Sequence, residues 1–497
     1  MSTFSGISTA LSSLIAQRAA LDVAGQNVAN ANTVGYTRQR ADLGALSAQV
    51  PSMFSTTNGV GTGVQVTGIS RSADPFLDTK LRSQTSGASF LAARAQAYST
   101  LESGLGEPTD DGLSTQLQTF WNDWHDVTNA PDTISTRSVL LDDARQLVDT
   151  IHQQYQVVAT QWSDARSTTS SLVDQTNALA ANVADLNQRI LDISVSGGSA
   201  NELQDQRDQA LTQLAGLVGA TTQTRADGGV DVYVGGSTLV SGASSRSLAL
   251  TGDQSFDQAT GYGADGSVIA PQGVYLVWAD QPSQTVVPTG GTLAGQLSVL
   301  APAAADGSGT GGMLAEAAKS LDTVATTLAT QVNALHQTAL TTAGTPGGDF
   351  FSVPDPSSTG PGSGPAALRL SVALTTADQV AVAGVDADGN SLGAYDASAG
   401  QKIAALGTST SGADAKWSQA VVTIGNASAA AQSRSSVAES ARASAEQDQL
   451  ANASVDTDEE TVNMMAAQRG YEAAARVLTT LDEMLDTLIN KTGEVGR

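Results

Sequence analysis

The sequence predicts a mainly α-helical, elongated subunit, in which N- and C-terminal segments form a helical bundle or coiled coil, with an inserted small β domain. All 13 prolines lie between Pro51 and Pro365, and none falls between Pro131 and Pro271. Because interior proline breaks helices, the proline-free stretches can hold long helices. Apolar residues in these stretches recur at alternating three- and four-residue steps, the spacing of a coiled-coil seam. Three parts of the chain depart from this pattern: residues 58–69, the glycine-rich middle, and residues 341–415. The last of these, dense in Gly, Ser, Pro and Ala, are predicted to form irregular structure with short helices.

The N-terminal segment predicts a helix with one apolar stripe, at strict seven-residue intervals: Ile7, Leu14, Leu21 and Val28. We expect Gly35 to adopt a left-handed conformation that stops this helix and sets the direction in which it leaves the body. The glycine-rich run from residue 58 to residue 69 predicts a hairpin.

The longest predicted helix spans residues 141–193, where three- and four-residue steps alternate without a slip. Fourteen of its sixteen seam positions are apolar, and 53 residues would extend roughly 80 Å as one helix. Gly197-Gly198 should end it. The seam could form a coiled coil between subunits or the core of one subunit's own bundle. We favour the bundle, because further helices are predicted at residues 77–98, 113–124, 202–217, 314–335 and 417–452.

The middle of the chain predicts strands. Val230, Val232 and Val234 alternate with other residues, and residues 274–278 and 285–287 are further strand candidates. We therefore divide the chain into a terminal assembly domain, a long-helix bundle and an inserted β domain that should be dispensable for folding of the helical body. Their predicted bounds are 1–35 plus 455–497, 36–224 plus 305–454, and 225–304.

The C-terminal segment predicts a second striped helix. Its seam consists of Met464, Ala467, Tyr471, Ala474, Leu478, Leu481, Leu485 and Leu488. Ordering an isolated helix costs more conformational entropy than its hydrogen bonds return in water. We therefore expect both terminal helices to lack a partner within the chain and to stay frayed until another subunit supplies one.

Composition excludes several classes of function. The formal net charge is −25, which argues against nucleic acid and anionic membranes as partners. The chain has no cysteine, so disulfides and thiolate metal sites are excluded. No run approaches 18 apolar residues, and residues 1–25 lack the pattern of a secretory signal. Composition alone would therefore predict a cytosolic protein.

For every candidate catalytic, cofactor-binding or metal site, an ordinary structural role explains the residues better. Residues 386–390 begin like a calcium-binding loop, but Ser391 and Ala397 occupy the places where an EF-hand needs Gly and Glu. The three histidines, His125, His152 and His336, are far apart, and we expect helix-surface or interface positions for them. No phosphate-binding loop or nucleophile elbow is present. We predict no enzyme and no cofactor.

The acidic cluster Asp456, Asp458, Glu459 and Glu460 could be interpreted as paired catalytic carboxylates. Stabilisation of a helix N-terminus explains this cluster better than catalysis, because acids in the first turn of a helix interact favourably with the positive end of its dipole. We expect Thr457 and Glu460 to form a capping box.

The same terminal segments resemble the bacterial flagellar rod, hook and hook-associated proteins. Residues 30–39, with Asn32, Gly35 and Tyr36, are similar to the N-terminal signature of that family, and residues 454–477 to its C-terminal signature. Within the family, the hook-associated members are most similar. The segments that carry this likeness are Thr37-Arg38-Gln39, residues 203–208 and Gly348-Asp349-Phe350-Phe351.

The resemblance implies a structural component of the flagellum that polymerises at the hook tip and joins the hook to the filament. The partners it implies are other copies of the chain, the hook protein, a second junction protein and, through it, the flagellin filament. It also implies an export chaperone on the C-terminal helix, with neither nucleic acid nor membrane as a partner. Such proteins are extracellular and leave the cell through the flagellar type III export channel without a cleaved signal, which overrides the prediction from composition.

We expect the two termini to form the assembly interface, with Tyr36 and Arg38 as candidates for contacts across subunits.

Two alternative functions remain. A flagellar hook or rod protein would share both end motifs but should lack the long helix and Gln206-Arg207-Asp208. A secreted rod-associated peptidoglycan hydrolase would need a carboxylate pair or metal site in a separate domain, and residues 225–304 show neither. The predicted interface residues are Ile7, Leu14, Leu21, Val28, Asn32, Gly35, Tyr36, Arg38, Tyr471, Leu478, Leu481, Leu485 and Leu488.

Overall fold

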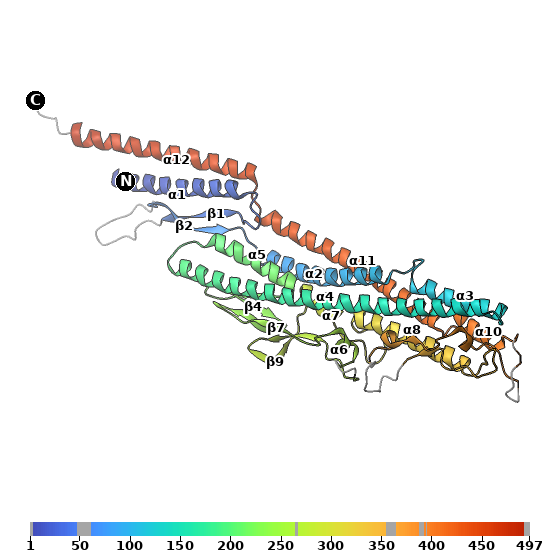
Figure 1. Ribbon diagram of the computed structural model, residues 1–497. Coiled ribbons are helices and arrows are strands. Elements are labelled where there is room, and N and C mark those ends of the chain that lie inside the picture. The colour runs from blue at the N-terminus through green and yellow to red at the C-terminus, as the bar shows by residue number, and fades with distance from the viewer. Residues whose placement is uncertain are drawn as a thin grey trace, which may run out of the picture.

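The computed structural model describes residues 3–46, 61–263, 267–353, 364–386, 392–393 and 395–491. The subunit is elongated and mainly helical, with two small antiparallel sheets against one flank and both termini at the same end (Figure 1). The first and last long helices lie side by side there, and residues of the two chain halves pack against each other along the body. The predicted fold class is confirmed.

The terminal end of the molecule combines two helices and a hairpin: α1 (Thr3–Asn30), α12 (Thr457–Asp486), β1 (Gln39–Leu46) and β2 (Gly63–Arg71). A π-helical turn, Thr487–Lys491, follows α12. The strands are antiparallel, with Gln39 opposite Arg71 and Leu46 opposite Gly63. The hairpin predicted at residues 58–69 is therefore wrong in extent. Residues 63–71 form one strand whose partner lies at 39–46, and residues 47–60 lie outside the described part of the chain.

The body is built from long helices close to the predicted ranges: α2 (Pro75–Leu105), α3 (Leu113–Asn129), α4 (Ile134–Val195), α5 (Asn201–Val218), α8 (Met313–His336) and α11 (Ala413–Ala453). Helix α4 has 62 residues and is about 93 Å long. It begins seven residues before the predicted start, and it ends before Gly197, whose φ of 75° is left-handed. Local signals explain other boundaries. Asp74 caps α2, and left-handed Gly106 ends it.

The seam of α4 is buried within the subunit. Ile151, Tyr155, Val158 and Trp162 are all at most 1% exposed and belong to one core with residues of α3 and α8. This core also contains an aromatic cluster in which Phe120 and Trp124 of α3 contact Phe350. The structure thus supports the single-subunit bundle over an intermolecular coiled coil.

Residues 221–299 form two sheets with short helices. The first sheet joins β3 (Thr221–Thr224), β4 (Val230–Val234), β5 (Ser237–Ser241) and β6 (Ser244–Ser245). The second joins β7 (Leu248–Gly252), β8 (Val274–Trp278) and β9 (Gln281–Val286), with α6 (Phe256–Thr260) and α7 (Gly291–Val299) beside it. Val232 and Trp278 share a core with Val183 of α4 and Leu211 of α5. The three-domain division stays a prediction, but these strands do not close on a core of their own.

Residues 341–415 hold short elements, as expected: β10 (Phe351–Ser352), α9 (Ala366–Arg369), β11 (Ser371–Val372), η1 (Ala377–Gln379), α10 (Ser398–Ala404) and η2 (Ala405–Thr408). Strands β10 and β11 pair with each other. Of the calcium-loop candidate, residues 387–391 lie outside the described residues.

The surface or interface position expected for His336 is wrong. It is fully buried at the end of α8, where Nδ1 lies 2.7 Å from the carbonyl oxygen of Gly348 and Nε2 accepts a hydrogen bond of 2.9 Å from the Ala381 amide. These contacts require the neutral tautomer that is protonated at Nδ1. His336 therefore ties the end of α8 to two later segments of the chain.

Candidate assembly site

Helices α1 and α12 pack directly on each other. A methyl group added at Gly6 would lie 3.1 Å from Leu481 Cδ1, and one added at Gly470 would lie 2.8 Å from Gln17 Cδ. The two apolar stripes therefore meet within one chain, and the expectation that neither has an internal partner is wrong. Each apolar stripe by itself is typical of a helix that lacks a partner, whereas the fold brings the two helices together from opposite ends of the chain.

The predicted interface residues fall into two groups. Ile7, Leu14, Leu21, Leu478, Leu481 and Leu485 are half-buried between the two helices or beside them. Val28, Tyr471 and Leu488 are 38%, 43% and 58% exposed. The most deeply buried apolar positions include small residues, Ala10 and Ala24 on α1 and Ala467 and Ala474 on α12, which allow the backbones to approach closely.

A second face of α1 packs on the hairpin. The Val64 amide donates a hydrogen bond of 3.3 Å to Ser12 Oγ, and Thr9 Oγ1 donates one of 3.3 Å to the Thr62 carbonyl oxygen. Ala16 and Val23 are also buried. Helix α1 thus lies between α12 and β1–β2, and we call α1 with α12 the terminal pair.

Helix α12 and the π-helical turn that follows it carry a second apolar line that α1 does not cover. Val462, Val477, Met484 and Leu488 are each more than half exposed. Together with exposed Ala466 and Ala473 they form two interleaved series with 11-residue spacing, which keeps them on one side of a nearly straight helix. We call these six residues the outer stripe. Sequence analysis missed it, although the 11-residue spacing was a signal that could have found it.

A buried polar cluster links the terminal pair to the body. Glu460 of α12, whose side chain is 4% exposed, accepts hydrogen bonds from Arg38 Nε at 2.8 Å and from Asn27 Nδ2 at 3.0 Å. Asn27 Nδ2 also donates to the Gln39 carbonyl oxygen, and Asn27 Oδ1 accepts from the Gln39 amide. One carboxylate and one carboxamide therefore hold the end of α1, the start of β1 and the first turn of α12 together.

The capping box predicted for Thr457 and Glu460 is wrong, because Asp456 caps α12 by accepting hydrogen bonds from the amides of Asp458 and Glu459. This frees Glu460 for the long-range contacts. Glu459 supports them from the surface, where its Oε1 lies 3.0 Å from Arg38 Nη2.

Helix α5 contributes two carboxylates, Asp205 and Asp208, to this cluster. Asp205 accepts a hydrogen bond of 3.1 Å from the Thr37 amide, and its Oδ1 lies 2.7 Å from Arg71 Nη2. Asp208 also pairs with Arg71, at 2.8 Å. Burial raises the pKa of Asp205, while Arg71 opposes this shift. We call Asn27, Tyr36, Thr37, Arg38, Gln39, Arg71, Asp205 and Glu460 the joint.

Tyr36 and Arg38, predicted as contacts across subunits, make contacts within the chain. Tyr36 donates a hydrogen bond of 2.9 Å to Asn27 Oδ1. Burial, and then the charges of Glu202, Asp205 and Glu460, raise the pKa of Tyr36 to about 12, so the hydroxyl remains a donor at neutral pH. Asn32 and Gly35 are exposed in the turn after α1. Gly35 has a left-handed φ of 81° but lies five residues after the helix end at Asn30, so it does not stop the helix.

The joint residues that sequence reasoning missed are Asn27, Arg71, Asp205 and Glu460. Asn27 lies off the predicted stripe, and the acids have ordinary surface roles in their local contexts. The resemblance in residues 203–208 did point to the segment that contains Asp205, but not to its contact with Thr37.

The described residues show neither a metal site nor a membrane-spanning helix. No group of three or more His, Asp or Glu side chains in that part of the chain is arranged to hold a metal ion. Among the same residues, no helix combines the length and the apolar character needed to cross a membrane.

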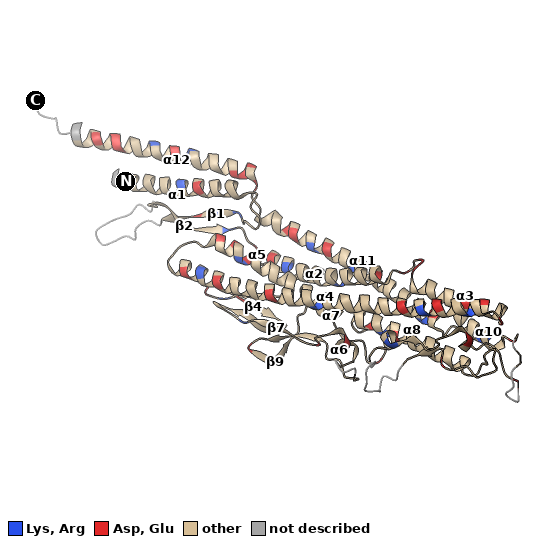
Figure 2. Ribbon diagram, viewed as in Figure 1, with Lys and Arg blue, Asp and Glu red and all other residues tan. Residues whose placement is uncertain are grey.

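The net charge is spread over several helices, with more acidic than basic residues along α4, α11 and α12 (Figure 2).

Three family profiles match separate parts of the chain. "Flagella basal body rod protein" matches residues 7–37, which cover most of α1 and the turn after it. "Flagellar basal body rod FlgEFG protein C-terminal" matches residues 446–491, which include α12. The profile described as "Flagellar hook-associated protein FlgK helical domain" matches residues 98–351, more than half of the chain.

Whole-chain comparison agrees with the third profile. The chain is 30% identical to flagellar hook-associated protein 1 of Bacillus subtilis over the full length of both proteins. The chain belongs to the flagellar hook-associated protein 1 family. Its similarity to the Escherichia coli and Salmonella typhimurium proteins of that name is 29%, over 70% of this chain and 60% of each relative.

The solved structure of the flagellar hook junction protein FlgK from Burkholderia pseudomallei supports the fold. It matches with a TM-score of 0.60 and 17% sequence identity, over 76% of this chain and all of that one. The hook-associated protein 1 family consists of structural proteins rather than enzymes, so the chain is a structural component of the extracellular flagellum at the hook–filament junction. The rod profiles match only the ends, and the body distinguishes this family member from the hook or rod alternative.

Proposed function

We propose that the terminal pair is the element through which this chain polymerises at the hook tip. The observation that carries the proposal is the outer stripe, an apolar line on α12 that remains exposed after α12 has packed on α1. Exposed apolar residues arranged along one helix face favour contact with another apolar helix face. Leu11 and Ile15 of α1, 50% and 59% exposed, add apolar surface to the same end of the molecule.

The predicted interface residues take different roles in this proposal. Those of the seam, such as Leu481 and Leu485, hold the terminal pair together, and Leu488 belongs to both the seam and the outer stripe. Contacts with neighbouring copies are then made by the pair as a unit.

Membership in the family supports a proposal for the partners. We propose that the lattice of copies joins the hook protein on one side and a second junction protein on the other, and through the latter the flagellin filament. Before export, a cytoplasmic chaperone would cover the C-terminal helix, whose exposed apolar residues would otherwise favour premature association.

The test is a double variant of the outer stripe, Val477→Gln with Met484→Gln. Gln has a helix propensity as good as Met and better than Val, so α12 should remain helical. The matched control, Thr479→Gln with Glu483→Gln, changes two exposed residues on the polar side of the same helix. Both proteins should be made and secreted, with equal helical circular dichroism.

We expect the outer-stripe variant to leave bare hooks in electron micrographs and to release flagellin monomers into the medium, while the control assembles normal filaments. Intracellular levels must be measured in parallel, because loss of chaperone binding would lower them before export. Normal filaments on the outer-stripe variant would exclude this face as the assembly element.

A further inference from the structure

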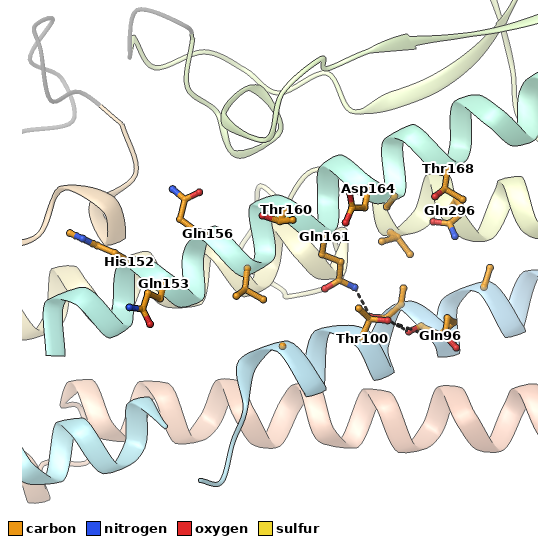
Figure 3. A pocket seen from close by; sticks show the side chains of 16 residues that line it. Gln96, Thr100, His152, Gln153, Gln156, Thr160, Gln161, Asp164, Thr168 and Gln296 are labelled. Carbon is orange, nitrogen blue, oxygen red and sulfur yellow. Dashed lines mark hydrogen bonds between the residues drawn. The ribbon is translucent and has the colours of Figure 1, made fainter. Parts of the chain in front are cut away.

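A shallow groove runs along the body, away from the terminal pair. It is lined by α2, α4 and α7 and has a volume of about 790 Å³. Figure 3 shows Gln156, Thr160 and Asp164 of α4 together with Gln96 and Thr100 of α2. The α4 residues that line it run from His152 to Thr168, a distance of about 24 Å along the helix.

The groove is nearly free of charge. Among the described residues that line it, Asp164 is the sole acid, and His152 is the sole side chain that could carry a positive charge. The rest are Gln, Thr, Ala, Val and Gly. Two copies of a chain with a net charge of −25 repel each other over most of their surfaces, so contact between copies is least costly where charge is absent.

Helix α11 carries a ridge with matching properties. The 17 residues from Trp417 to Ser433 include no charged side chain. They also span about 24 Å along a helix. The outward side of this segment presents Ser418, Val422, Asn426, Ala429 and Ser433, all exposed. Val422 is 58% exposed, although it is apolar. We call these five residues the ridge.

Charges flank both surfaces in a complementary way. Lys416 and Arg434 bound the ridge, and neither forms an ion pair within the described residues. Asp149 and Asp164 project from the same side of α4 near the two ends of the groove and are likewise exposed and outside any ion pair described there. The acids are 15 residues apart and the cations 18, which corresponds to about 22 and 27 Å.

We propose that the groove of one copy receives the ridge of α11 from a neighbouring copy, so that Asp149 and Asp164 face Lys416 and Arg434. This rests on the proposed function, because it assigns the contact between the bodies of copies that the terminal pairs assemble. The ridge cannot fill the groove of its own chain. Its helix is fixed against the opposite side of α2 by contacts such as Ser428 Oγ donating to Glu102 and Lys80 pairing with Asp448.

A groove and a ridge on different faces make a heterologous contact, which generates rings or helical arrays rather than closed two-fold dimers. Small residues on the ridge allow the two helices to approach closely. The helix can lie in either direction, since both directions bring the cations to the acids.

The chain contains no cysteine, which allows a clean cross-linking test. The pair Gln156→Cys with Asn426→Cys places one thiol at the middle of the groove and one at the middle of the ridge. The matched control, Ser138→Cys with Asn426→Cys, keeps the ridge thiol but moves the other to an exposed position on α4, about 27 Å from residue 156. Both variants are expressed in cells that lack the natural chain, and flagella are isolated under reducing conditions and then oxidised.

We expect oxidation to convert most of the Gln156/Asn426 variant into a ladder of disulfide-linked dimers and higher oligomers, at least tenfold above the control. Motility before oxidation verifies that the junction has assembled. Assembled flagella without the ladder would overturn the proposed contact and leave the proposed function standing. If the variant assembles no filament, Val157→Cys with Asn426→Cys replaces it, because both positions lie at the centre in either direction, and the same two outcomes decide.

Charge reversal gives a second, independent test. Asp149→Lys with Asp164→Lys should reduce the number of filaments per cell severalfold, and so should Lys416→Glu with Arg434→Glu. Combining all four substitutions should restore filament number. Additive loss in the combined variant would overturn the proposed pairing, whereas failure of the outer-stripe experiment would leave this result unaffected.

Discussion

Arg38 and Glu460 form an ion pair of 2.8 Å between Nε and Oε1, although 422 residues separate them in the chain. Arg38 follows the turn after α1, and Glu460 lies in the first turn of α12. The pair therefore closes the joint at the point where both terminal helices leave the body. Asn27 completes it by donating to the same carboxylate.

Replacing Glu460 should loosen the terminal pair from the body. Glu460→Ala leaves the Arg38 guanidinium and the Asn27 carboxamide without their buried partner, which costs about 2 to 4 kcal/mol. We expect a lower midpoint in urea and faster proteolytic cleavage at residues 31–37. Glu459→Ala removes a partner of Arg38 whose side chain is 56% exposed and should cost less than about 1 kcal/mol. Equal effects of the two substitutions would contradict the role of Glu460.

His336 should make the stability of the body depend on pH on the acid side. Burial lowers the pKa of His336 below its ordinary value of 6.5. The neutral ring therefore contributes stability that is fully present above pH 6.5 and is lost as the pH falls through the folded-state pKa. His336→Gln should reduce this loss and lower stability at pH 7.5 by about 2 kcal/mol, because Gln cannot reach both the Gly348 and Ala381 groups in the same way.

The exposed His125→Gln serves as the matched control for urea denaturation at pH 7.5 and pH 5.5. Nitrogen NMR of the His336 ring should show a proton on Nδ1 and none on Nε2 at pH 7.5. A doubly protonated ring at that pH would refute this assignment.

Asp123 should make the stability of the body depend on pH in the opposite direction, with stability lost as the pH rises. Burial, with Asp143 next to it, raises the pKa of Asp123 to about 7. A carboxyl group with a raised folded-state pKa contributes stability that is present below pH 3.8 and lost as the pH rises through about 7. Asp123→Asn should remove this loss and raise the free energy of unfolding at pH 8 by about 2 kcal/mol. Asp110→Asn, at an exposed loop position, should leave the pH profile unchanged, and an equal response to the two substitutions would rule out Asp123 as the source.

Protease should attack the terminal pair before the body. Two helices on one hairpin bury little surface compared with the bundle, so we expect trypsin to remove the ends of the purified chain first and to leave a stable core. Leu481→Asp with Leu485→Asp places two charges between α1 and α12 and should speed removal of both ends together by at least tenfold. The polar pair Thr479→Gln with Glu483→Gln should not. Accelerated loss of the C-terminal end alone would show that α1 does not depend on α12.

The β insertion should prove necessary for part of the helical body. The three-domain division predicts that residues 225–304 can be replaced by a Gly/Ser linker. The shared core predicts instead that Val183, Leu211 and Leu214 would become exposed and that the second half of α4 would lose protection from hydrogen exchange. An unchanged helical circular dichroism signal and melting temperature would favour the independent domain.

The elements that the sequence predicted well are those with a local signal. The uninterrupted three- and four-residue steps identified the buried side of α4, including Tyr155 and Trp162, because a long amphipathic helix repeats the same packing many times. The Gly197-Gly198 pair likewise placed the end of α4, observed at Val195, within a few residues.

Long-range relationships could not be predicted in the same way. Helix α12 packs on α1 because the fold of the whole chain brings its two ends together. The spacing of apolar residues within either helix does not predict this pairing. Glu460 shows the limit most clearly. Its position three residues after Thr457 matches a capping box, yet its carboxylate is used for contacts with Asn27 and Arg38, which a local rule cannot anticipate.

The unbroken length of α4 has a mechanical consequence. A helix of 62 residues buried along its seam cannot shorten or bend sharply without opening its core. Any compliance of the assembled junction must therefore arise at the ends of the subunit rather than within its shaft. With a lever of about 93 Å, a rotation of only about 10° at the joint would swing the far end of the body by about 16 Å.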